Sequence, residues 1–222
     1  MDFSNKIILV TGASRGIGRE IAKMFAERGG KVAVHYNHNE AMAQATLDAM
    51  NGDGHMLIQA DVSDPDAVKK MVDTVAEKMG GLDILVNNAG IAEEHPLTEV
   101  DYDEWQLRWN RTIKTNLMGP ANAIYCAAQH MIPRGGGRIV NVSSRGAFRG
   151  EPTNPAYAAS KAGMNAMGQS LAKALGSDNI LIGTVAPGWV ATEMARDALT
   201  GPEADAVLNQ SPLGRVAKPE EV

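Results

Sequence analysis

The most informative absences in this sequence concern cysteine and long apolar runs. The chain of 222 residues has one cysteine, Cys126, which excludes an internal disulfide framework. Its five histidines show no ligand spacing, and without a cysteine cluster we expect no metal site. No apolar run approaches the roughly 20 residues of a membrane-spanning helix, and the first strand pattern begins too close to Met1 for a signal peptide. We therefore expect a cytoplasmic protein without membrane contact.

The sequence also lacks an excess of positive charge, internal repeats and linker-like segments. The formal net charge is −5, which argues against nucleic acid or an anionic membrane as a partner. Hydrophobic residues make up 44% and charged residues 21% of the chain, as is ordinary for a globular protein. We expect residues 1–222 to form a single domain.

Strand-like and helix-like patterns alternate along the whole chain. Short apolar runs predict six strands, and longer segments with helical spacing lie between them. This alternation is typical of a doubly wound parallel α/β sheet of the Rossmann type, which binds ligands at the carboxyl ends of its strands. The strands are predicted at Ile7–Val10, Lys31–Tyr36, His55–Ala60, Leu82–Asn87, Arg138–Ser143 and Ile180–Val185, and the later helices at 38–50, 65–79, 101–132 and 152–176.

A glycine-rich turn follows the first strand. Residues 11–18 have the sequence TGASRGIG, and Ile17, Ile21 and Phe25 give the next segment the apolar stripe of a helix. A strand, a glycine turn and a helix in this order predict a phosphate site, because the helix N-terminus offers unpaired N–H groups and glycine allows close approach. The spacing Gly-x3-Gly-x-Gly differs from the common GxGxxG, so a plain tight turn or a methyltransferase loop is an alternative.

The second strand lacks the acid that would favour NAD. Dinucleotide folds that prefer NAD place an Asp or Glu there to bind the ribose 2′-OH, whereas this chain continues with Asn37 and His38. Arg15, within the glycine turn, could instead reach a 2′-phosphate. We therefore predict NADP(H) rather than NAD(H), the alternative being that Arg15 is only a solvated turn residue.

Polar residues also follow the third and fourth strands. Asp61 and Val62 follow the third strand, where a carboxylate can accept a hydrogen bond from an adenine amino group. Asp61 could equally be a turn or N-cap residue, because the segment 63–65 begins a helix. Asn87–Gly90 follows the fourth strand and can let a ribose approach the backbone, or form a plain polar turn.

Four further residues carry candidate chemistry. Asn116 lies in an apolar part of the predicted 101–132 helix, where such an amide is usually structural and can also kink the helix and free a backbone carbonyl. Ser144 follows the fifth strand, and Tyr157 and Lys161 share one face of the next helix because they are four residues apart. A Tyr–Lys pair at this spacing is common by chance, and the upstream serine and glycine turn make the set specific.

In this order the motifs resemble those of the short-chain dehydrogenase/reductase family, and TGASRGIGR, LVNNAG and VAPGWVATEM resemble its 3-oxoacyl-acyl-carrier-protein reductase-like members. The resemblance extends from Lys6 to Val222. It implies a subunit of a dimer or tetramer that transfers a hydride between NAD(P) and a carbonyl or alcohol. The cofactor-binding residues predicted here are Gly12, Ser14, Arg15, Gly16, Ile17, Gly18, Asn37, Asp61, Val62, Asn88, Ala89, Gly90, Tyr157, Lys161, Pro187, Gly188, Val190 and Thr192.

The predicted catalytic residues are Asn116, Ser144, Tyr157 and Lys161. Tyr157 is the candidate general acid, but a free phenol has a pKa of about 10. Lys161 on the same helix face should lower that pKa and, by the resemblance, binds the nicotinamide ribose. The resemblance also implies that Asn116 holds a proton-relaying water, while Ser144 donates to the substrate oxygen.

The substrate site is outlined only coarsely by Ser144, Arg145, Tyr157 and Trp189. Arg145 could meet an acidic or thioester-linked carbonyl compound, or be a solvated loop residue. We expect an NADP(H)-dependent reductase of ketones or 3-oxoacyl thioesters, whose small-molecule substrate is free or linked to an acyl carrier or CoA. The alternatives are an NAD-dependent alcohol, sugar or steroid dehydrogenase of the same family, and a non-catalytic dinucleotide sensor.

The carboxyl-terminal end and the subunit contacts complete the expectations. The residues before Val222 begin a helix, and family members usually continue through that helix and an edge strand, which we expect to be missing. We also expect a homo-oligomer, because small residues on two predicted helices permit close helix approach, unless they pack within the subunit. These residues are Ala121, Ala123, Ala127 and Ala128 on one helix and Ala158, Ala159, Ala162, Gly163 and Ala166 on the other.

Overall fold

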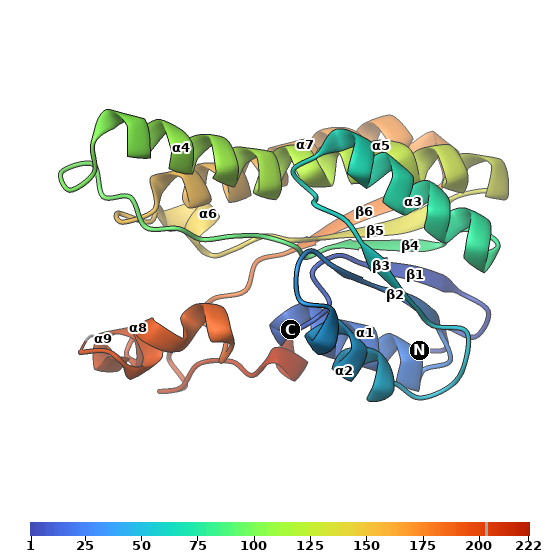
Figure 1. Ribbon diagram of the computed structural model, residues 1–222, viewed down its shortest axis with the longest axis horizontal. Helices are drawn as coiled ribbons and strands as arrows, with labels where there is room; N and C mark the ends of the chain where they lie inside the picture. Colours follow the sequence, from blue (N-terminus) through green and yellow to red (C-terminus); the bar gives the residue numbers. More distant parts are fainter. Residues whose placement is uncertain (203) are drawn as a thin grey trace.

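The computed structural model describes residues 1–202 and 204–222 as three layers, with a sheet between two layers of helices (Figure 1). The strands are β1 (Ile7–Val10), β2 (Lys31–Tyr36), β3 (Met56–Gln59), β4 (Ile84–Asn87), β5 (Gly137–Val142) and β6 (Ile180–Val185). The helices are α1 (Gly16–Glu27), α2 (Glu40–Asp48), α3 (Pro65–Met79), α4 (Tyr102–Ile113), α5 (Gly119–Met131), α6 (Gly146–Arg149), α7 (Pro155–Leu175), α8 (Arg196–Thr200) and α9 (Ala204–Leu208).

All six strands are parallel and lie in the order β3-β2-β1-β4-β5-β6. Parallel sheets are covered on both faces, which explains the unbroken apolar runs of the strands. Ile8 and Val10 pack towards α1 and α2, whereas Leu9 and Leu85 pack towards α3 and α5. This is the predicted doubly wound Rossmann-type sheet, and its strand order reverses between β1 and β4, so the carboxyl ends of these strands border the ligand-binding crevice.

The predicted 101–132 helix is divided by one π-helical turn. α4 passes into this turn at Lys114–Met118 and then into α5, and the Gly119 N–H donates to the Lys114 carbonyl five residues earlier. Pro120 has no N–H to offer the carbonyl of Asn116 four residues before it, which favours the wider turn. The helix is therefore disturbed around Asn116, as expected, but the wider turn is favoured by Pro120 rather than by the Asn116 side chain.

Three of the alanines expected at a subunit contact lie inside the chain instead. Ala123, Ala127 and Ala128 are buried where α5 packs on α3, so this part of the expectation is wrong. The small residues do indicate close helix packing, but α3, the helix that packs against α5, belongs to the same chain. On α7, Ala159 and Ala162 are exposed and leave that helix face open to a contact.

The last strand lies at the edge of the sheet. Leu181 and Val185 of β6 are 53% and 37% exposed, whereas Ile180 on the opposite face is fully buried. The short helices α6, α8 and α9 were not predicted, because a helix of one turn leaves little periodic pattern in the sequence. Within residues 1–202 and 204–222, no helix has the length and apolar character needed to cross a membrane.

Candidate active site

The glycine turn between β1 and α1 has a backbone that requires glycine. Gly12 and Gly16 have φ angles of 64° and 55°, in the left-handed region. A Cβ atom on Gly18 would collide with the Asn88 amide and with the Gly12 carbonyl. The Ser14 carbonyl accepts a hydrogen bond of 3.2 Å from Thr46 of α2, so the turn is held from both sides.

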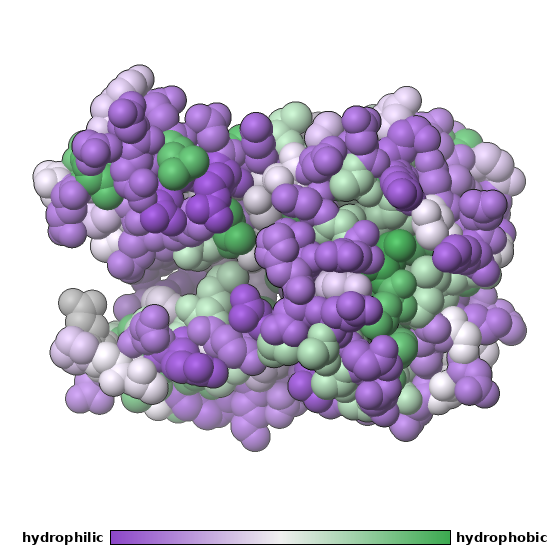
Figure 2. Space-filling view, in the orientation of Figure 1, coloured by the Kyte–Doolittle hydropathy of each residue, from purple (hydrophilic) through white to green (hydrophobic). Residues whose placement is uncertain are grey.

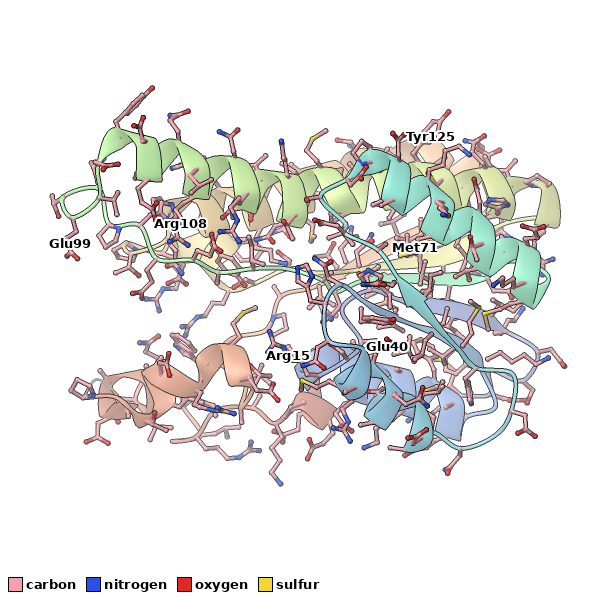
Figure 3. The ribbon with its side chains drawn as sticks, in the orientation of Figure 1. Arg15, Glu40, Met71, Glu99, Arg108 and Tyr125 are labelled. Carbon is pink, nitrogen blue, oxygen red and sulfur yellow. The ribbon has the colours of Figure 1, made fainter. Side chains whose placement is uncertain are left out.

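The amino terminus of α1 opens at the carboxyl edge of the sheet. Arg15 is its N-cap residue, but the Arg15 side chain makes no capping hydrogen bond, and the first turn, which includes the half-buried Ile17, contains no acid. The first N–H groups of a helix lack partners within the helix and attract anions. This end of α1 therefore fits the phosphate site that the glycine spacing predicts, and the Arg15 side chain is exposed beside it (Figure 3).

Thr11 and Asn88 bind the segment after β4 to the glycine turn. Thr11 Oγ1 donates to the Val86 carbonyl at 3.2 Å and accepts from the N–H groups of Asn88 and Ala89, both at 3.0 Å. Asn88 Nδ2 donates to the carbonyls of Thr11 and Gly12 at 2.9 and 3.0 Å. The Asn87–Gly90 segment is thus more than a polar turn, because it sets the position of the glycine loop.

His35 of β2 completes this framework, and the sequence analysis missed it. Its Nδ1 accepts a hydrogen bond of 2.9 Å from the Gly12 N–H, and its Nε2 lies 3.0 Å from the Ala60 carbonyl. Burial lowers the pKa of His35 to about 4, so the neutral ring donates from Nε2 and accepts at Nδ1. The available signal was a polar residue at a buried position of the strand KVAVHY.

The residues expected near an adenosine adopt turn geometry. Asp61 Oδ1 accepts from the backbone N–H and the hydroxyl of Ser63, both at 2.8 Å. The N-cap of α3 is Asp64, so Asp61 is a turn residue rather than a cap. The Asn37 carbonyl accepts from Gln59 Nε2 at 2.8 Å, and the side chain of Asn37 is partly exposed at the same edge.

An acid that the sequence analysis did not include lies just beyond β2. Burial and the Glu40 carboxylate raise the pKa of Tyr36, whose hydroxyl faces Glu40. Figure 3 shows Arg15 and Glu40 at the amino-terminal ends of α1 and α2. The end of β2 is acid-free as predicted, but a carboxylate is close to it. Val62, the other predicted residue of this region, is buried.

Ser144, Tyr157 and Lys161 form one group between the end of β5 and the start of α7. Lys161 Nζ donates to the Val142 carbonyl at 2.8 Å and lies 5.8 Å from the centre of the Tyr157 ring. The Ser144 hydroxyl oxygen accepts from the Gly146 N–H at 3.0 Å. The helical spacing of four residues therefore brings Tyr157 and Lys161 together, as predicted.

Burial controls the pKa values in this group. It raises the pKa of Tyr157, with a further increase from the Glu151 carboxylate, while the Ser144 hydroxyl lowers it. Burial lowers the pKa of Lys161 to about 8. The expected decrease of the Tyr157 pKa through Lys161 is not what the protein alone produces, because removal of the phenol from water dominates and the Lys161 ammonium points at a backbone carbonyl.

Asn116 joins the same group through the segment after β4. Its Oδ1 accepts from the Ile91 N–H at 2.9 Å, and its Nδ2 donates to the Ile91 carbonyl at 2.8 Å and to Ser160 Oγ at 3.2 Å. A Cβ atom on Gly90 would lie 3.3 Å from Asn116 Oδ1 and 3.6 Å from Lys161 Nζ. Asn116 is therefore a satisfied structural amide that also borders the Tyr157–Lys161 group.

The segment 187–192 passes from β6 to the glycine turn. A Cβ atom on Gly16 would lie 3.2 Å from Thr192 Cγ2, and both residues line a hollow of about 390 Å³. Val190 is buried, and its carbonyl accepts from the Thr192 N–H at 2.8 Å. The Pro187 carbonyl accepts from the Arg145 N–H at 2.9 Å, which places Gly188 close to the segment that follows β5 and contains Ser144.

The predicted cofactor and catalytic residues thus lie along one edge of the sheet. The sequence matches the family described as "short chain dehydrogenase" over residues 6–202. The chain belongs to this family. It is therefore an NAD(P)-dependent oxidoreductase.

Relatives of known name support the assignment. The 3-oxoacyl-[acyl-carrier-protein] reductase FabG of Staphylococcus aureus (strain Mu50 / ATCC 700699) is 39% identical over 219 residues, which cover 98% of this chain and 87% of the relative. The enzyme of the same name from Vibrio cholerae is 36% identical, covering 100% and 88%. A short-chain type dehydrogenase/reductase of Picea abies is 38% identical, covering 98% and 82%.

A solved structure has the same fold. The crystal structure of a short-chain dehydrogenase from Burkholderia cenocepacia J2315 in complex with NADP superposes with a TM-score of 0.87 at 36% sequence identity. The match covers 100% of this chain and 88% of the other.

In this short-chain dehydrogenase a second buried histidine lies in the 92–97 segment, which was expected to frame the substrate pocket, but its hydrogen bonds could not be foreseen from the sequence. His95 is fully buried, its Nδ1 lies 2.7 Å from the Glu93 carbonyl, and its Nε2 accepts from the Ala156 N–H at 3.3 Å. The Trp105 ring of α4 packs against it edge to face. His95 thereby ties the loop after β4 to the residue that precedes Tyr157.

Arg145 and Trp189, two of the residues predicted to contact the substrate, lie close together in the structure. Both line a hollow of about 370 Å³ with Gly188 and Gln210. In the space-filling view the molecule is hollowed between the layer of α4 and the segment of α8 (Figure 2). Ser144 lies two residues after β5 and directly before Arg145, and Tyr157 lies in the first turn of α7.

Proposed function

We propose that this short-chain dehydrogenase uses NADPH to reduce ketones or 3-oxoacyl thioesters, with Tyr157 as the proton donor. The observation that carries the proposal is that Ser144, Tyr157 and Lys161 lie close together beside Gly90. The names of the bacterial relatives support the thioester class, and the NADP complex of the Burkholderia protein supports the cofactor.

The edge of the sheet fits a dinucleotide because its glycine turn leaves a backbone cradle and an uncapped helix end. In the proposal Gly12, Gly16 and Gly18 receive the pyrophosphate, and Arg15 and Asn37 receive a 2′-phosphate. When bound, the nicotinamide supplies or accepts the hydride. The other proposed contacts are Ser14 and Ile17 at the phosphates, Asp61 and Val62 at the adenine, Asn88, Ala89, Gly90, Tyr157 and Lys161 at the riboses, and Pro187, Gly188, Val190 and Thr192 at the carboxamide.

Each catalytic side chain has one task in the reduction. As the carbonyl carbon gains the hydride, Tyr157 transfers its phenolic proton to the oxygen, so that the product is the alcohol. Ser144 donates a hydrogen bond to the same oxygen and fixes its position. Lys161 stabilises the phenolate that remains, and a water at the carbonyl of Asn116 returns a proton to it. The positive charge of the oxidised nicotinamide favours the phenolate as well.

A panel of carbonyl substrates tests the proposal. We expect NADPH oxidation, followed by its absorbance, to be faster with an acetoacetyl thioester than with sugars, and faster with NADPH than with NADH. Rapid turnover of a sugar or steroid while the thioester is inert would overturn the substrate class. Binding of NADPH without turnover of any carbonyl compound would favour a dinucleotide sensor.

We also propose a homodimer or homotetramer in which α7 contacts a second copy. The exposed Ala159, Ala162 and Ala166 of this helix would permit close helix approach. Light scattering should give a mass of two or four chains, and Ala162→Arg should lower it. A monomeric mass of the unmodified chain would contradict this.

A further inference from the structure

Three hydrogen-bond donors converge on one neutral oxygen at the mouth of the site. Gln210 Oε1 accepts from Arg145 Nη2 at 2.6 Å, from Arg149 Nη1 at 2.9 Å and from Trp189 Nε1 at 3.3 Å. An amide oxygen has two lone pairs, so three donors exceed its capacity. Two of the donors are guanidinium groups, whose geometry matches a carboxylate or phosphate. The donor set is therefore better suited to an anion than to an amide.

The charges of these two arginines are not balanced by the described residues. Arg108 pairs with Glu93 and Glu104, and Arg215, which lines the same hollow, pairs with Glu221 at 2.7 Å. Within residues 1–202 and 204–222, by contrast, no carboxylate lies within 4.0 Å of either guanidinium that contacts Gln210. Two like charges share one neutral acceptor, and an anionic ligand would relieve their repulsion.

The cluster lies next to the proposed reaction centre. Arg145 directly follows Ser144, and its backbone N–H donates to Pro187, two residues before Trp189. The hollow of about 370 Å³ is bordered by Arg145, Trp189 and Gln210 and gives a substrate chain room beside the serine. A group bound there would belong to the same molecule as the carbonyl held by Ser144.

We propose that Arg145, Arg149 and Trp189 form a subsite for an anionic group of the substrate, and that Gln210 Oε1 marks the position of its oxygen. The inference rests on the proposed function and narrows it to carbonyl compounds that carry a carboxylate or a phosphate. Gln210 is exposed in the turn after α9, so its side chain can leave towards water at little cost. The oxygen of the ligand then accepts the three hydrogen bonds that Gln210 Oε1 accepts without ligand.

Pairs of substrates that share a carbonyl group but differ in charge test whether the anionic group contributes to recognition. 4-Oxopentanoate is compared with its methyl ester, and acetoacetyl-4′-phosphopantetheine with the neutral acetoacetyl-pantetheine, which differ only in the phosphate. We expect kcat/KM to favour the charged member of at least one pair by about tenfold or more, because hydrogen bonds to charged groups are lost with the neutral member. The first pair tests whether a carboxylate is bound and the second whether a phosphate is bound, so the two comparisons distinguish the two kinds of anion. An equal preference in both pairs would overturn the subsite but leave the reductase proposal standing.

Substitutions at Gln210 give the sharpest contrast. Gln210→Glu puts a carboxylate of the chain itself among the three donors, and the preference for charged substrates should fall about tenfold. Gln210→Ala removes the internal competitor and should retain or increase that preference. Arg149→Gln should lower the preference, whereas Lys173→Gln on the exposed last turn of α7 removes the same charge elsewhere and should not. A preference that follows Lys173 rather than Arg149 would point to general surface charge and refute the subsite.

Binding without turnover provides an independent readout. Succinate and inorganic phosphate are titrated into the protein while tryptophan fluorescence is recorded, with Trp189→Phe as the blank. We expect saturable quenching by at least one anion, with loss of binding in Gln210→Glu and tighter binding in Gln210→Ala. If neither anion binds the unmodified protein, the subsite is refuted even when no substrate is turned over, and the reductase proposal is judged by the carbonyl panel alone.

Discussion

The cofactor side and the substrate side of this site are built in different ways. Around the glycine turn the polar groups are buried and reciprocally bonded, as in the contacts of Thr11 with Asn88 and of His35 with Gly12. In the segment after residue 187, which contains α8 and α9, the helices have five residues each and most side-chain hydrogen bonds are exposed, including those of Gln210.

The difference indicates which part of the molecule is free to vary. A buried bond network around the glycine turn cannot be altered at one position without leaving an unsatisfied polar group, which costs roughly 1–3 kcal/mol. Exposed side chains around a hollow can be exchanged with small effects on stability. We therefore expect changes on the cofactor side to affect folding and cofactor together, and changes on the substrate side to affect selectivity.

The largest expected effect comes from Tyr157, the proposed proton donor, whose loss affects the chemical step and neither the cofactor side nor the substrate side. Tyr157→Phe removes only the phenolic hydroxyl and should lower kcat about 10²- to 10⁴-fold, the contribution of a positioned proton donor, while NADPH still binds. Steady-state kinetics and NADPH fluorescence titration measure the two quantities. Tyr125→Phe, at an exposed tyrosine of α5, is the control and should be without effect. Retention of most activity in Tyr157→Phe would contradict the assignment of the proton donor.

The next effect is a pH dependence of stability that arises from His35. Its pKa in the folded protein is about 4, below the 6.5 of a histidine exposed to water, so the unfolded chain binds the proton more readily. The stabilisation is complete above pH 6.5 and is lost as the pH falls towards 4, by about 3 kcal/mol in total. Asp61 is the nearby charge and acts weakly in the opposite direction.

Denaturant unfolding of His35→Gln across this pH range measures the contribution. The variant should be less stable at neutral pH and should have a flatter pH dependence than the unmodified chain. His38→Gln, at an exposed histidine, should keep the original pH dependence. Parallel curves for the His35 variant and the unmodified chain would show that the buried ring does not titrate in this range.

Arg15 tests whether the cofactor side also selects the cofactor. Loss of a guanidinium–phosphate contact should cost about 1.5–3 kcal/mol of NADPH binding and leave NADH binding nearly unchanged. The ratio of the two dissociation constants of Arg15→Ala, compared with the unmodified protein, measures this. Equal affinity of the unmodified protein for both cofactors would remove the basis of the NADP preference, and the nearby Glu40 would then be the residue to change.

A pair of glycine substitutions compares the two regions directly and gives the smallest effects. Gly18→Ala forces a methyl group against Asn88 and the Gly12 carbonyl and should destabilise the fold by about 1–3 kcal/mol. Gly188→Ala, in the segment after residue 187 where the cofactor and substrate regions meet, places its Cβ within 4 Å of nothing and should change stability by less than about 0.5 kcal/mol. Thermal unfolding measures both variants. Equal destabilisation would show that the two sides are packed alike.

Several elements of the fold could be located from the sequence alone. The bounds of β1, β2, β6 and α3 agree with the predicted ranges. β1 and β2 are buried on both faces and read as apolar runs, the edge strand β6 begins with three apolar residues, and Pro65 marks the start of α3. The predicted start of α7 was three residues early, since the segment before Pro155 has helix-compatible residues but forms a turn. Local pattern is thus sufficient where an apolar run or a proline marks the end of an element.

The candidate site was also largely visible, because its residues follow strand ends and share a helix face. The spacing of Tyr157 and Lys161 is a local property, and so is the glycine spacing of the first turn. The direction of the Tyr157 pKa shift could not be predicted, since it depends on how completely the phenol is removed from water.

The sequence by itself determined the order of strands and helices, the glycine turn and the helix face of the catalytic pair, because each depends on residues a few positions apart. Only the tertiary structure decided which distant groups meet. His35 finds the Gly12 N–H 23 residues away, and Gln210 lies among donors 21 to 65 residues before it. Such contacts depend on how the parallel strands align and on how later segments fold back over their carboxyl ends. No local sequence pattern indicates that alignment.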